Sequence, residues 1–233
     1  MNLFYSEDAG KSNGILSGDD HKHCTKVLRY RIGDEIQVFN GKGLLCDALI
    51  THVTKEETHF TTTSVKEETR KTALKAISIC PVKSMDRLEW FVEKATEIGI
   101  TDIYLMQCRR SEKLNINMGR LEKIALSATK QSLQLWKPII HDMAPISDLL
   151  SHFLEYKHKY IAHCHHPLPL LEDDSHDESS VLFIGPEGDF TTEEVNTAES
   201  LNFISVSLGK TRLRTETAGI VGATMLLHSA NKS

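Results

Sequence analysis

Residues 181–190 read Val-Leu-Phe-Ile-Gly-Pro-Glu-Gly-Asp-Phe, an apolar run that ends in a glycine-rich turn. Residues 208–218 read Leu-Gly-Lys-Thr-Arg-Leu-Arg-Thr-Glu-Thr-Ala, where an apolar run at 204–208 again meets a glycine and then a helix-forming segment. In open α/β sheets, ligands bind in the crevice outside the carboxyl ends of the strands. We therefore expect the two loops to lie on adjacent strands and to form one ligand site.

Each loop has features that suit ligand binding. Glycines at 185 and 188 let the backbone approach a ligand closely, and Pro186 stiffens the turn. The order of residues is not GxGxxG, so a Rossmann dinucleotide site is not supported. The loop at 208–218 runs into a helix whose first N–H groups suit carbonyl or phosphate oxygens. Taken singly, the first loop also fits a plain tight turn, and the second fits a helix cap flanked by surface arginines.

Residues 73–233 alternate short apolar strands with segments of helical period, and this alternation predicts a mostly parallel sheet with helices on both faces. Thr191 and Glu194 form a capping box, and Gly99 is placed to end a helix that Ser84 caps. The expected strands are 74–80, 103–106, 160–163, 181–184 and 204–208. The expected helices are 84–99, 118–134, 146–156, 191–201 and 215–229.

Residues 1–72 have a different character, with short runs rich in Thr, Val, Ile and Phe. Strands are expected at 36–39, 44–52 and 58–65. Turn signals at 33–34 and at Asn40-Gly41-Lys42-Gly43 separate them. This pattern predicts a small all-β barrel, and the polar stretch 66–72 is the expected linker.

The 233 residues carry a formal net charge of -5, which at first argues against a nucleic-acid partner. The segment 172–178 contains five acids and no Lys or Arg, so it accounts for the whole excess, and it is expected to be a solvated loop. The rest of the chain is neutral, with basic residues gathered in three places. These are Lys22, Lys26, Arg29 and Arg31; Arg109, Arg110 and Lys113; and Lys210, Arg212 and Arg214.

The cysteines and histidines exclude other classes. Five scattered cysteines without a CxxC pair indicate reduced thiols, and neither an apolar leader nor an 18-residue apolar span is present, so a soluble cytoplasmic protein with no membrane partner is expected. The twelve histidines include 163, 165 and 166 in His-Cys-His-His. Adjacent residues on a strand point to opposite faces, and the spacing does not match a zinc site, so no metal is expected.

With these residues in view, the ordered pair GPEG at 185–188 and LRTETA at 213–218 resembles the SPOUT methyltransferase superfamily. Within it, the chain resembles the 16S rRNA (uracil-N3)-methyltransferase family, which methylates a uridine of small-subunit ribosomal RNA. Residues 23–29 resemble the H..RVLR segment of that family, residues 93–99 its EKxTELG helix, and residues 110–111 its RS pair. The resemblance spans nearly the whole chain.

The chain departs from the family pattern at four places. Asp189 replaces the last glycine of GPEGG, and Thr211 stands where LGxRILRTETA has its first arginine. Residues 130–134 read Lys-Gln-Ser-Leu-Gln in place of EQSxR, and residues 2–4 lack an early arginine. These changes affect individual contacts to RNA or cofactor and leave the two central motifs intact.

The resemblance implies a PUA-like β-barrel that helps to grip RNA, over 1–72, and a SPOUT α/β domain with a trefoil knot, over 73–233. It also implies a homodimer and S-adenosylmethionine (SAM) held by the knot loops. We expect the SAM-binding residues to come from the two loops and from the end of the strand at 160–163. They are His163, Ile184, Gly185, Pro186, Glu187, Gly188, Leu208, Gly209, Leu213, Arg214, Thr215, Glu216, Thr217 and Ala218.

Methylation at N3 of uracil needs loss of a proton or stabilisation of the resulting anion. Arg214 is the first candidate to stabilise that anion, because a guanidinium is always charged. Glu216 or Glu187 is the candidate base, and either also fits a cap or a loop brace. The expected RNA contacts are cationic and lie outside the two loops. They are Lys22, His23, Lys26, Arg29, Arg31, Arg110 and Lys113, which otherwise form a solvated charged surface.

Two other functions fit the same features less well. A non-catalytic RNA-binding or ribosome-assembly factor would not need the intact LRTETA loop. A SPOUT enzyme acting on transfer RNA or on another ribosomal RNA base fits the N-terminal barrel less well. Because the chain outside 172–178 is neutral, we expect it to prefer the assembled small subunit over free 16S rRNA.

Overall fold

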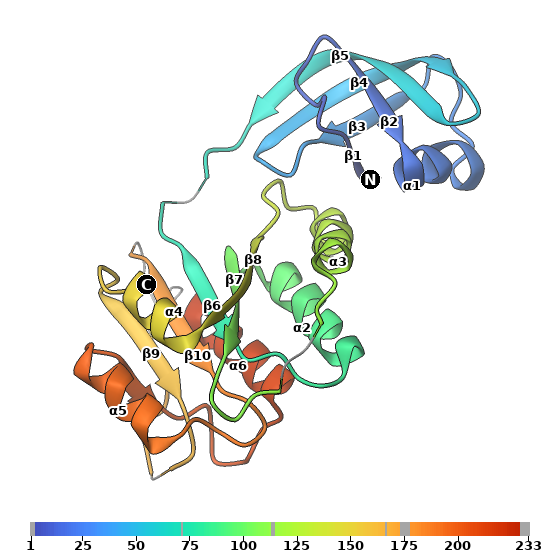
Figure 1. The fold of residues 1–233 in the computed structure, drawn as a ribbon. Helices are drawn as coiled ribbons and strands as arrows, with labels where there is room; N and C mark the ends of the chain where they lie inside the picture. The colour runs from blue at the N-terminus through green and yellow to red at the C-terminus, as the bar shows by residue number, and fades with distance from the viewer. Residues whose placement is uncertain (1–2, 71, 113–114, 166, 173–177, 229–233) are drawn as a thin grey trace. The chain divides into compact units, whose positions relative to one another are not determined.

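The computed structural model describes residues 3–70, 72–112, 115–165, 167–172 and 178–228 (Figure 1). The chain divides into two compact units. Unit 1 comprises Met1–Arg70 together with Thr129–Lys137, and unit 2 comprises Lys71–Ala128 together with Pro138–Ser233. A short segment from the second half of the sequence therefore completes the N-terminal unit.

The N-terminal unit is a curled five-stranded sheet in the order β1-β3-β4-β5-β2 (Figure 1). The β1–β3 pair is parallel and the other pairs are antiparallel. Gly41 and Gly43 have φ of 70° and 91° in the turn between β3 and β4, as the hairpin signal predicts. The strands are Leu3–Tyr5 (β1), Asn13–Ser17 (β2), Glu35–Phe39 (β3), Leu44–Val53 (β4) and Glu57–Glu67 (β5). The sheet curls into a half-barrel, in agreement with the small β-barrel that the sequence predicts.

The inner face of this sheet buries Phe4, Leu16, Val38 and Phe60. Helix α1 (Gly18–Lys22) and the π-helical turn η1 (His23–Val27), which the sequence did not predict, add the buried Cys24. The basic segment 18–27 is thus helical and is anchored to the sheet by the buried Cys24.

The segment 129–137 is tied to the N-terminal sheet by both charged and backbone contacts. Lys130 Nζ lies 3.0 Å from Asp20 Oδ1, and the same carboxylate oxygen accepts from the Tyr5 backbone N–H at 3.1 Å. Gly43 donates to the Leu135 carbonyl at 3.0 Å, and the Trp136 indole donates to the Glu68 carbonyl at 3.0 Å. The departure from the family pattern at position 130 is therefore matched by a partner acid within the same unit.

The C-terminal unit is built on a six-stranded sheet in the order β11-β9-β10-β6-β7-β8, and every described pair is parallel. The strands are Lys75–Ile79 (β6), Asp102–Gln107 (β7), Ile139–Pro145 (β8), His158–Ala162 (β9), Ser180–Ile184 (β10) and Ile204–Val206 (β11). The prediction that β10 and β11 are adjacent is wrong, because β9 lies between them.

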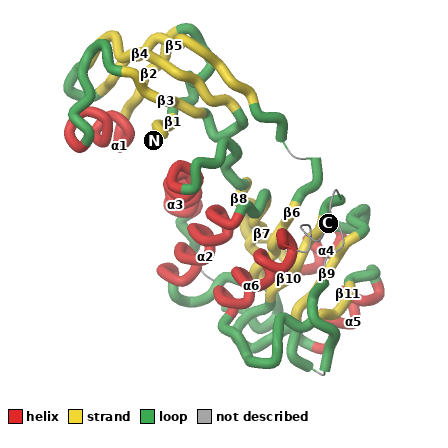
Figure 2. The backbone as a smooth tube through the Cα atoms, turned by 180° about the vertical axis from the view of Figure 1, so that it is seen from behind, coloured by secondary structure: helices red, strands yellow, loops and turns green. Residues whose placement is uncertain are grey.

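Helices cover both faces of this sheet, as predicted. On one face, α2, α3 and α6 pack over Ile77, Ile103 and Leu182, and Figure 2 shows α2 and α6 in front of the strands. On the other face, α4 and α5 pack over Phe183 and Ile161. The helices are Met85–Ile98 (α2), Met118–Gln131 (α3), Ile146–His152 (α4), Thr192–Ser200 (α5) and Thr215–His228 (α6).

Local signals placed most helix ends correctly. Gly99 ends α2 with φ of 104°, and Thr191 and Glu194 make both bonds of the capping box of α5. The predicted cap Ser84 precedes α2 without a side-chain capping bond.

Three elements end two or more residues earlier than predicted. Helix α3 ends at Gln131, because Leu133 takes a left-handed φ of 57°. Helix α4 ends at His152, and β11 ends at Val206. Strands β1, β2 and β8 were missed altogether. Within the described ranges, no helix is long and apolar enough to cross a membrane.

Candidate active site

The loops after β10 and β11 meet although β9 separates their strands. Thr215, at the start of α6, donates its hydroxyl to the Gly185 carbonyl at 3.2 Å. Arg212 donates from Nη2 to the Glu187 carbonyl at 3.1 Å. The expected single site is thus assembled by contacts between the loops, without adjacency of their strands.

The loop after β10 is braced from outside the two motifs. Arg110 donates from Nη1 to the Gly188 carbonyl at 2.8 Å and to the Phe190 carbonyl at 3.3 Å. A Cβ on Gly185 would lie 3.0 Å from the Phe190 ring, so this turn has little room for a larger residue. The role of Arg110 seen in the structure is to hold this loop.

Asp189, which replaces a glycine of the family pattern, has a left-handed φ of 62°. Aspartate tolerates this conformation when its short side chain bonds locally. Its Oδ1 accepts from the Phe190 N–H at 2.8 Å, and its Oδ2 accepts from the Cys164 N–H at 2.9 Å. The substitution therefore keeps the backbone turn and adds a tie to the loop after β9.

The loop after β11 is more open. Gly209 has φ of 135°, and a Cβ there would meet nothing within 4 Å. Lys210, Thr211, Arg212 and Arg214 are exposed. Within the described part of the chain, no hydrogen bond or ion pair engages the Arg214 guanidinium. That cation is therefore available to a ligand.

Glu216 is the buried charge of this site, with 7% of the residue exposed. Its Oε1 lies 3.6 Å from Arg87 Nε, and Arg87 Nη1 lies 3.5 Å from Glu187 Oε1. Glu216 Oε2 is buried and has no hydrogen-bond partner among the described residues. Such an orphaned acceptor costs about 1–3 kcal/mol. Sequence analysis missed Arg87, whose two partners lie far along the chain.

His163 follows β9 and is buried. Its Nε2 lies 3.0 Å from Ser205 Oγ, which donates to Glu199 Oε1 at 2.6 Å. Its Nδ1 accepts from the His165 N–H at 3.4 Å. These contacts connect His163 to β11 and α5, and its part in binding a cofactor stays a prediction.

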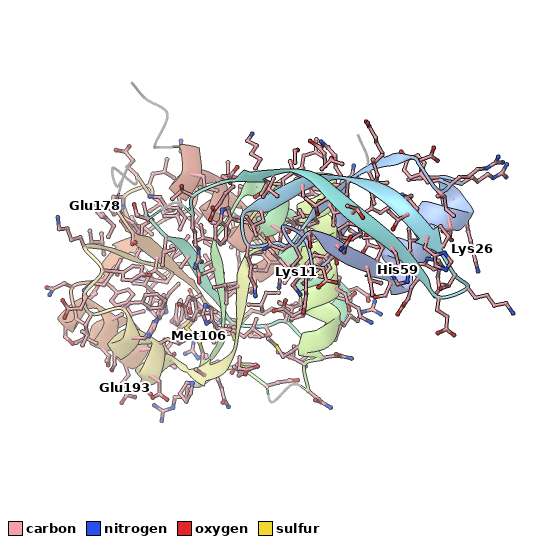
Figure 3. The ribbon with its side chains drawn as sticks, turned by 90° about the horizontal axis from the view of Figure 1, so that it is seen from above. Lys11, Lys26, His59, Met106, Glu178 and Glu193 are labelled. Carbon is pink, nitrogen blue, oxygen red and sulfur yellow. The ribbon has the colours of Figure 1, made fainter. Side chains whose placement is uncertain are left out.

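The predicted RNA-binding residues fall in both units. Lys22, His23, Lys26, Arg29 and Arg31 are exposed on α1, on η1 and on the loop that follows, and Figure 3 labels Lys26. Lys22 Nζ lies 3.8 Å from Asp19 in a solvent-exposed pair. Arg110 belongs to the C-terminal unit, and Lys113 lies outside the described residues.

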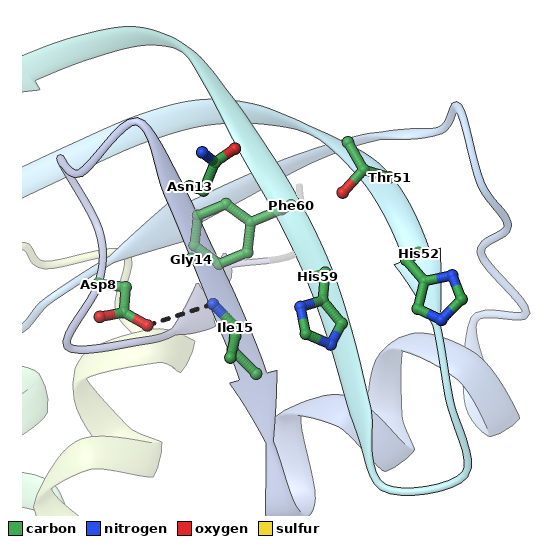
Figure 4. A pocket seen from close by; sticks show the side chains of 8 residues that line it. All are labelled: Asp8, Asn13, Gly14, Ile15, Thr51, His52, His59 and Phe60. Carbon is green, nitrogen blue, oxygen red and sulfur yellow. Dashed lines mark hydrogen bonds between the residues drawn. The ribbon is translucent and has the colours of Figure 1, made fainter.

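A separate hollow lies on the N-terminal sheet, where Asp8 Oδ2 accepts from the Ile15 N–H at 3.3 Å (Figure 4). Gly14 is required there, because its Cβ would lie 2.3 Å from Phe60 Cζ. The hollow is lined by Asp8, Asn13, Gly14, Ile15, Thr51, His52, His59 and Phe60. None of these is a predicted site residue. The described residues contain no group of three His, Cys, Asp or Glu side chains placed to hold a metal.

Comparisons with known proteins agree with this architecture. A family profile described as an RNA methyltransferase domain matches residues 69–227, and one described as an RNA methyltransferase PUA domain matches residues 16–62. The Rickettsia conorii protein named "Ribosomal RNA small subunit methyltransferase E" is 31% identical over 213 residues, which cover 88% of this chain and 85% of the relative. The chain belongs to the ribosomal RNA small subunit methyltransferase E family.

Solved structures of similar proteins extend the comparison. A "probable rRNA-methyltransferase" from Porphyromonas gingivalis is 32% identical, with a TM-score of 0.90 over 99% of this chain and 98% of its own. The ribosomal RNA small subunit methyltransferase E of Neisseria gonorrhoeae, solved bound to SAM, is 25% identical, with a TM-score of 0.81 over 96% of this chain and 95% of its own. The family resemblance and the α/β fold with an N-terminal PUA-like domain are thereby confirmed.

Proposed function

We propose that this chain transfers a methyl group from SAM to N3 of a uridine in the 16S rRNA of the small ribosomal subunit. The carrying observation is its 31% identity, over most of both chains, to a relative named as a small-subunit ribosomal RNA methyltransferase. The SAM-bound neighbour from Neisseria gonorrhoeae supports the cofactor. The uridine N3 specificity rests on the order of the GPEG and LRTETA motifs.

The residues of the two loops fit SAM. Gly209 leaves open space beside its backbone, where a Cβ would meet nothing within 4 Å. The orphaned Oε2 of Glu216 provides a buried acceptor at the start of α6. The proposed SAM-binding set is therefore the one expected from the sequence, with His163, Ile184–Gly188, Leu208, Gly209 and Leu213–Ala218.

SAM, when bound, supplies an electrophilic methyl group on a sulfonium. The protein must place uracil N3 in line with that methyl and favour loss of the N3 proton. Arg214, exposed and without a described partner, is proposed to pair with a uracil carbonyl oxygen and so stabilise the developing anion. Of the two candidate bases, we propose Glu216. Its side chain is buried in the site, whereas the side chain of Glu187 is 58% exposed.

The same proposal covers the partners. The exposed cations from Lys22 to Arg31 would contact RNA phosphate, and residues 1–72 would serve as the RNA-binding domain beside a methyltransferase domain over 73–233. Because N3 lies on the Watson–Crick edge, the target uridine must be unpaired or extruded. A homodimer and a trefoil knot belong to the proposal. An isolated β-bridge between Leu170 and Ser207 holds the loops after β9 and β11 side by side, and this contact supports the proposed knot.

The test is methyl transfer from labelled SAM to small ribosomal subunits from cells that lack the protein, followed by mapping of the modified base. The proposal predicts one labelled uridine carrying the methyl at N3. Label at another base, or in transfer RNA, would make the chain a different RNA methyltransferase. Binding to subunits without any transfer would favour a non-catalytic assembly factor.

A further inference from the structure

Arg87 connects three elements of the site, although it belongs to neither motif. It lies in the first turn of α2, and its guanidinium reaches Glu216 at the start of α6 and Glu187 in the loop after β10. The Arg87 side chain is 38% exposed and that of Glu216 is 9% exposed. One cation on α2 therefore pairs with both a buried carboxylate and an exposed one.

The unpaired oxygen of Glu216 defines the chemistry of what it can bind. A carboxylate held against a guanidinium accepts hydrogen bonds and donates none. The missing partner of Oε2 is therefore a donor, and a phosphate or carboxylate group would be repelled. The N-terminus of α6 alone would attract anions, and the carboxylate of Glu216 in its first turn offsets that attraction.

We propose that Arg87 is a positioning residue for methyl transfer, which fixes Glu216 so that its Oε2 accepts a hydrogen bond from an N–H group of the bound ligand. This rests on the proposed function. Two N–H sources fit that chemistry: the amino groups of SAM and the N3–H of uracil. In either case the ligand N–H pairs with a buried acceptor that the protein leaves unpaired. A ligand without that N–H group would bind less well.

The experiment compares the R87Q, R87K and E216Q variants and the R87Q/E216Q double variant with the wild-type protein. R120Q is the matched control. Arg120 lies on α3 and pairs with Glu89, which is on α2 like Arg87 but, among the described residues, makes no hydrogen bond or ion pair with the two loops. Three quantities are measured for each: the dissociation constant for SAM by calorimetry, kcat and KM for methylation of small subunits, and the melting temperature.

R87Q and E216Q are each expected to lower kcat/KM by about tenfold or more. The double variant should be no worse than the poorer single variant, because the two residues act through one contact. R87K should recover part of the loss, and R120Q should stay near wild type. A raised dissociation constant for SAM in E216Q identifies the cofactor as donor. An unchanged constant with lowered kcat identifies uracil.

Wild-type kcat/KM in R87Q, additive losses in the double variant, or unchanged SAM affinity and kcat in E216Q would each overturn the inference. If R87Q melts below the assay temperature, R87K decides: a value between wild type and E216Q supports the role, and full activity contradicts it. Failure of the wild-type chain to bind SAM or to transfer methyl would instead refute the proposed function.

Discussion

The loops after β10 and β11 meet in one site but are held in opposite ways. In the loop after β10, the protein's own side chains occupy the backbone carbonyls. The acceptors are Gly185, Glu187, Gly188 and Phe190. Two of the side chains that donate to these carbonyls, Arg212 and Thr215, come from the segment after β11. In the same segment, Gly209 has open space beside it and Arg214 is exposed. The first loop is therefore held in place by the protein itself, and we propose that the second supplies the side chains that contact the substrate.

The largest expected effect is on the open loop. Arg214→Ala should lower kcat by about 10²–10³-fold, because it removes a charge proposed to stabilise the uracil anion. Single-turnover methyl transfer measures this, with circular dichroism to verify folding. Lys210→Ala, an exposed cation of the same loop, is the control and should stay near wild type. A folded Arg214→Ala protein with near-normal transfer would show that the open loop does not supply the reactive charge.

The next effect is on the fixed rim. Arg110→Ala removes the donor to the Gly188 and Phe190 carbonyls and should weaken SAM binding by about tenfold. Calorimetric titration with SAM checks this. Arg109→Ala is the matched control, because that guanidinium pairs with Glu193 of α5 at 2.5 Å. Equal SAM affinities in the two variants would mean that bracing of this loop is unimportant for the cofactor.

A smaller effect separates backbone conformation from side-chain bonding at position 189. Asp189→Ala loses two hydrogen bonds and forces alanine into a left-handed φ of 62°, whereas Asp189→Gly loses only the bonds. The alanine variant should be less stable than the glycine variant by about 1 kcal/mol. Urea unfolding measures the difference. Equal stabilities would show that the turn carries no conformational requirement.

The smallest effect lies outside both loops. Lys26→Ala on η1 should weaken binding to small subunits a few-fold and reduce the salt slope by about one unit. Filter binding over a range of salt concentrations checks this, and SAM affinity should not change. Lys11→Ala, an exposed lysine paired with Asp8 at 2.6 Å, is the control. An identical salt slope in the Lys26 variant would remove η1 from the RNA-binding surface.

Local features of the sequence were predictable, and non-local pairings were not. The capping box at Thr191 and the helix end at Gly99 depend on residues within one turn, so both were found. Strand order depends on contacts between distant segments, which explains why β9 was not expected between β10 and β11. Strand β1 has only three residues, and β2 reads Asn-Gly-Ile-Leu-Ser, which shows no alternation of apolar and polar residues.

The same reasoning applies to the site. The two motifs carry their signal in consecutive residues, so the sequence indicated both loops. Arg87 shows no local signal, because its meaning comes from carboxylates on two other elements. Arg110 was predicted as an RNA contact, and its bonds to the loop after β10 emerge only in three dimensions.

The central claim is that the loops after β10 and β11 together hold the cofactor. A crystal structure of the chain with SAM tests it most directly. We expect SAM to lie against the backbone of Gly185–Gly188, of Leu208 and Gly209, and of Leu213. SAM bound elsewhere, for example in the hollow beside Asp8 and His59 on the N-terminal sheet, would contradict it.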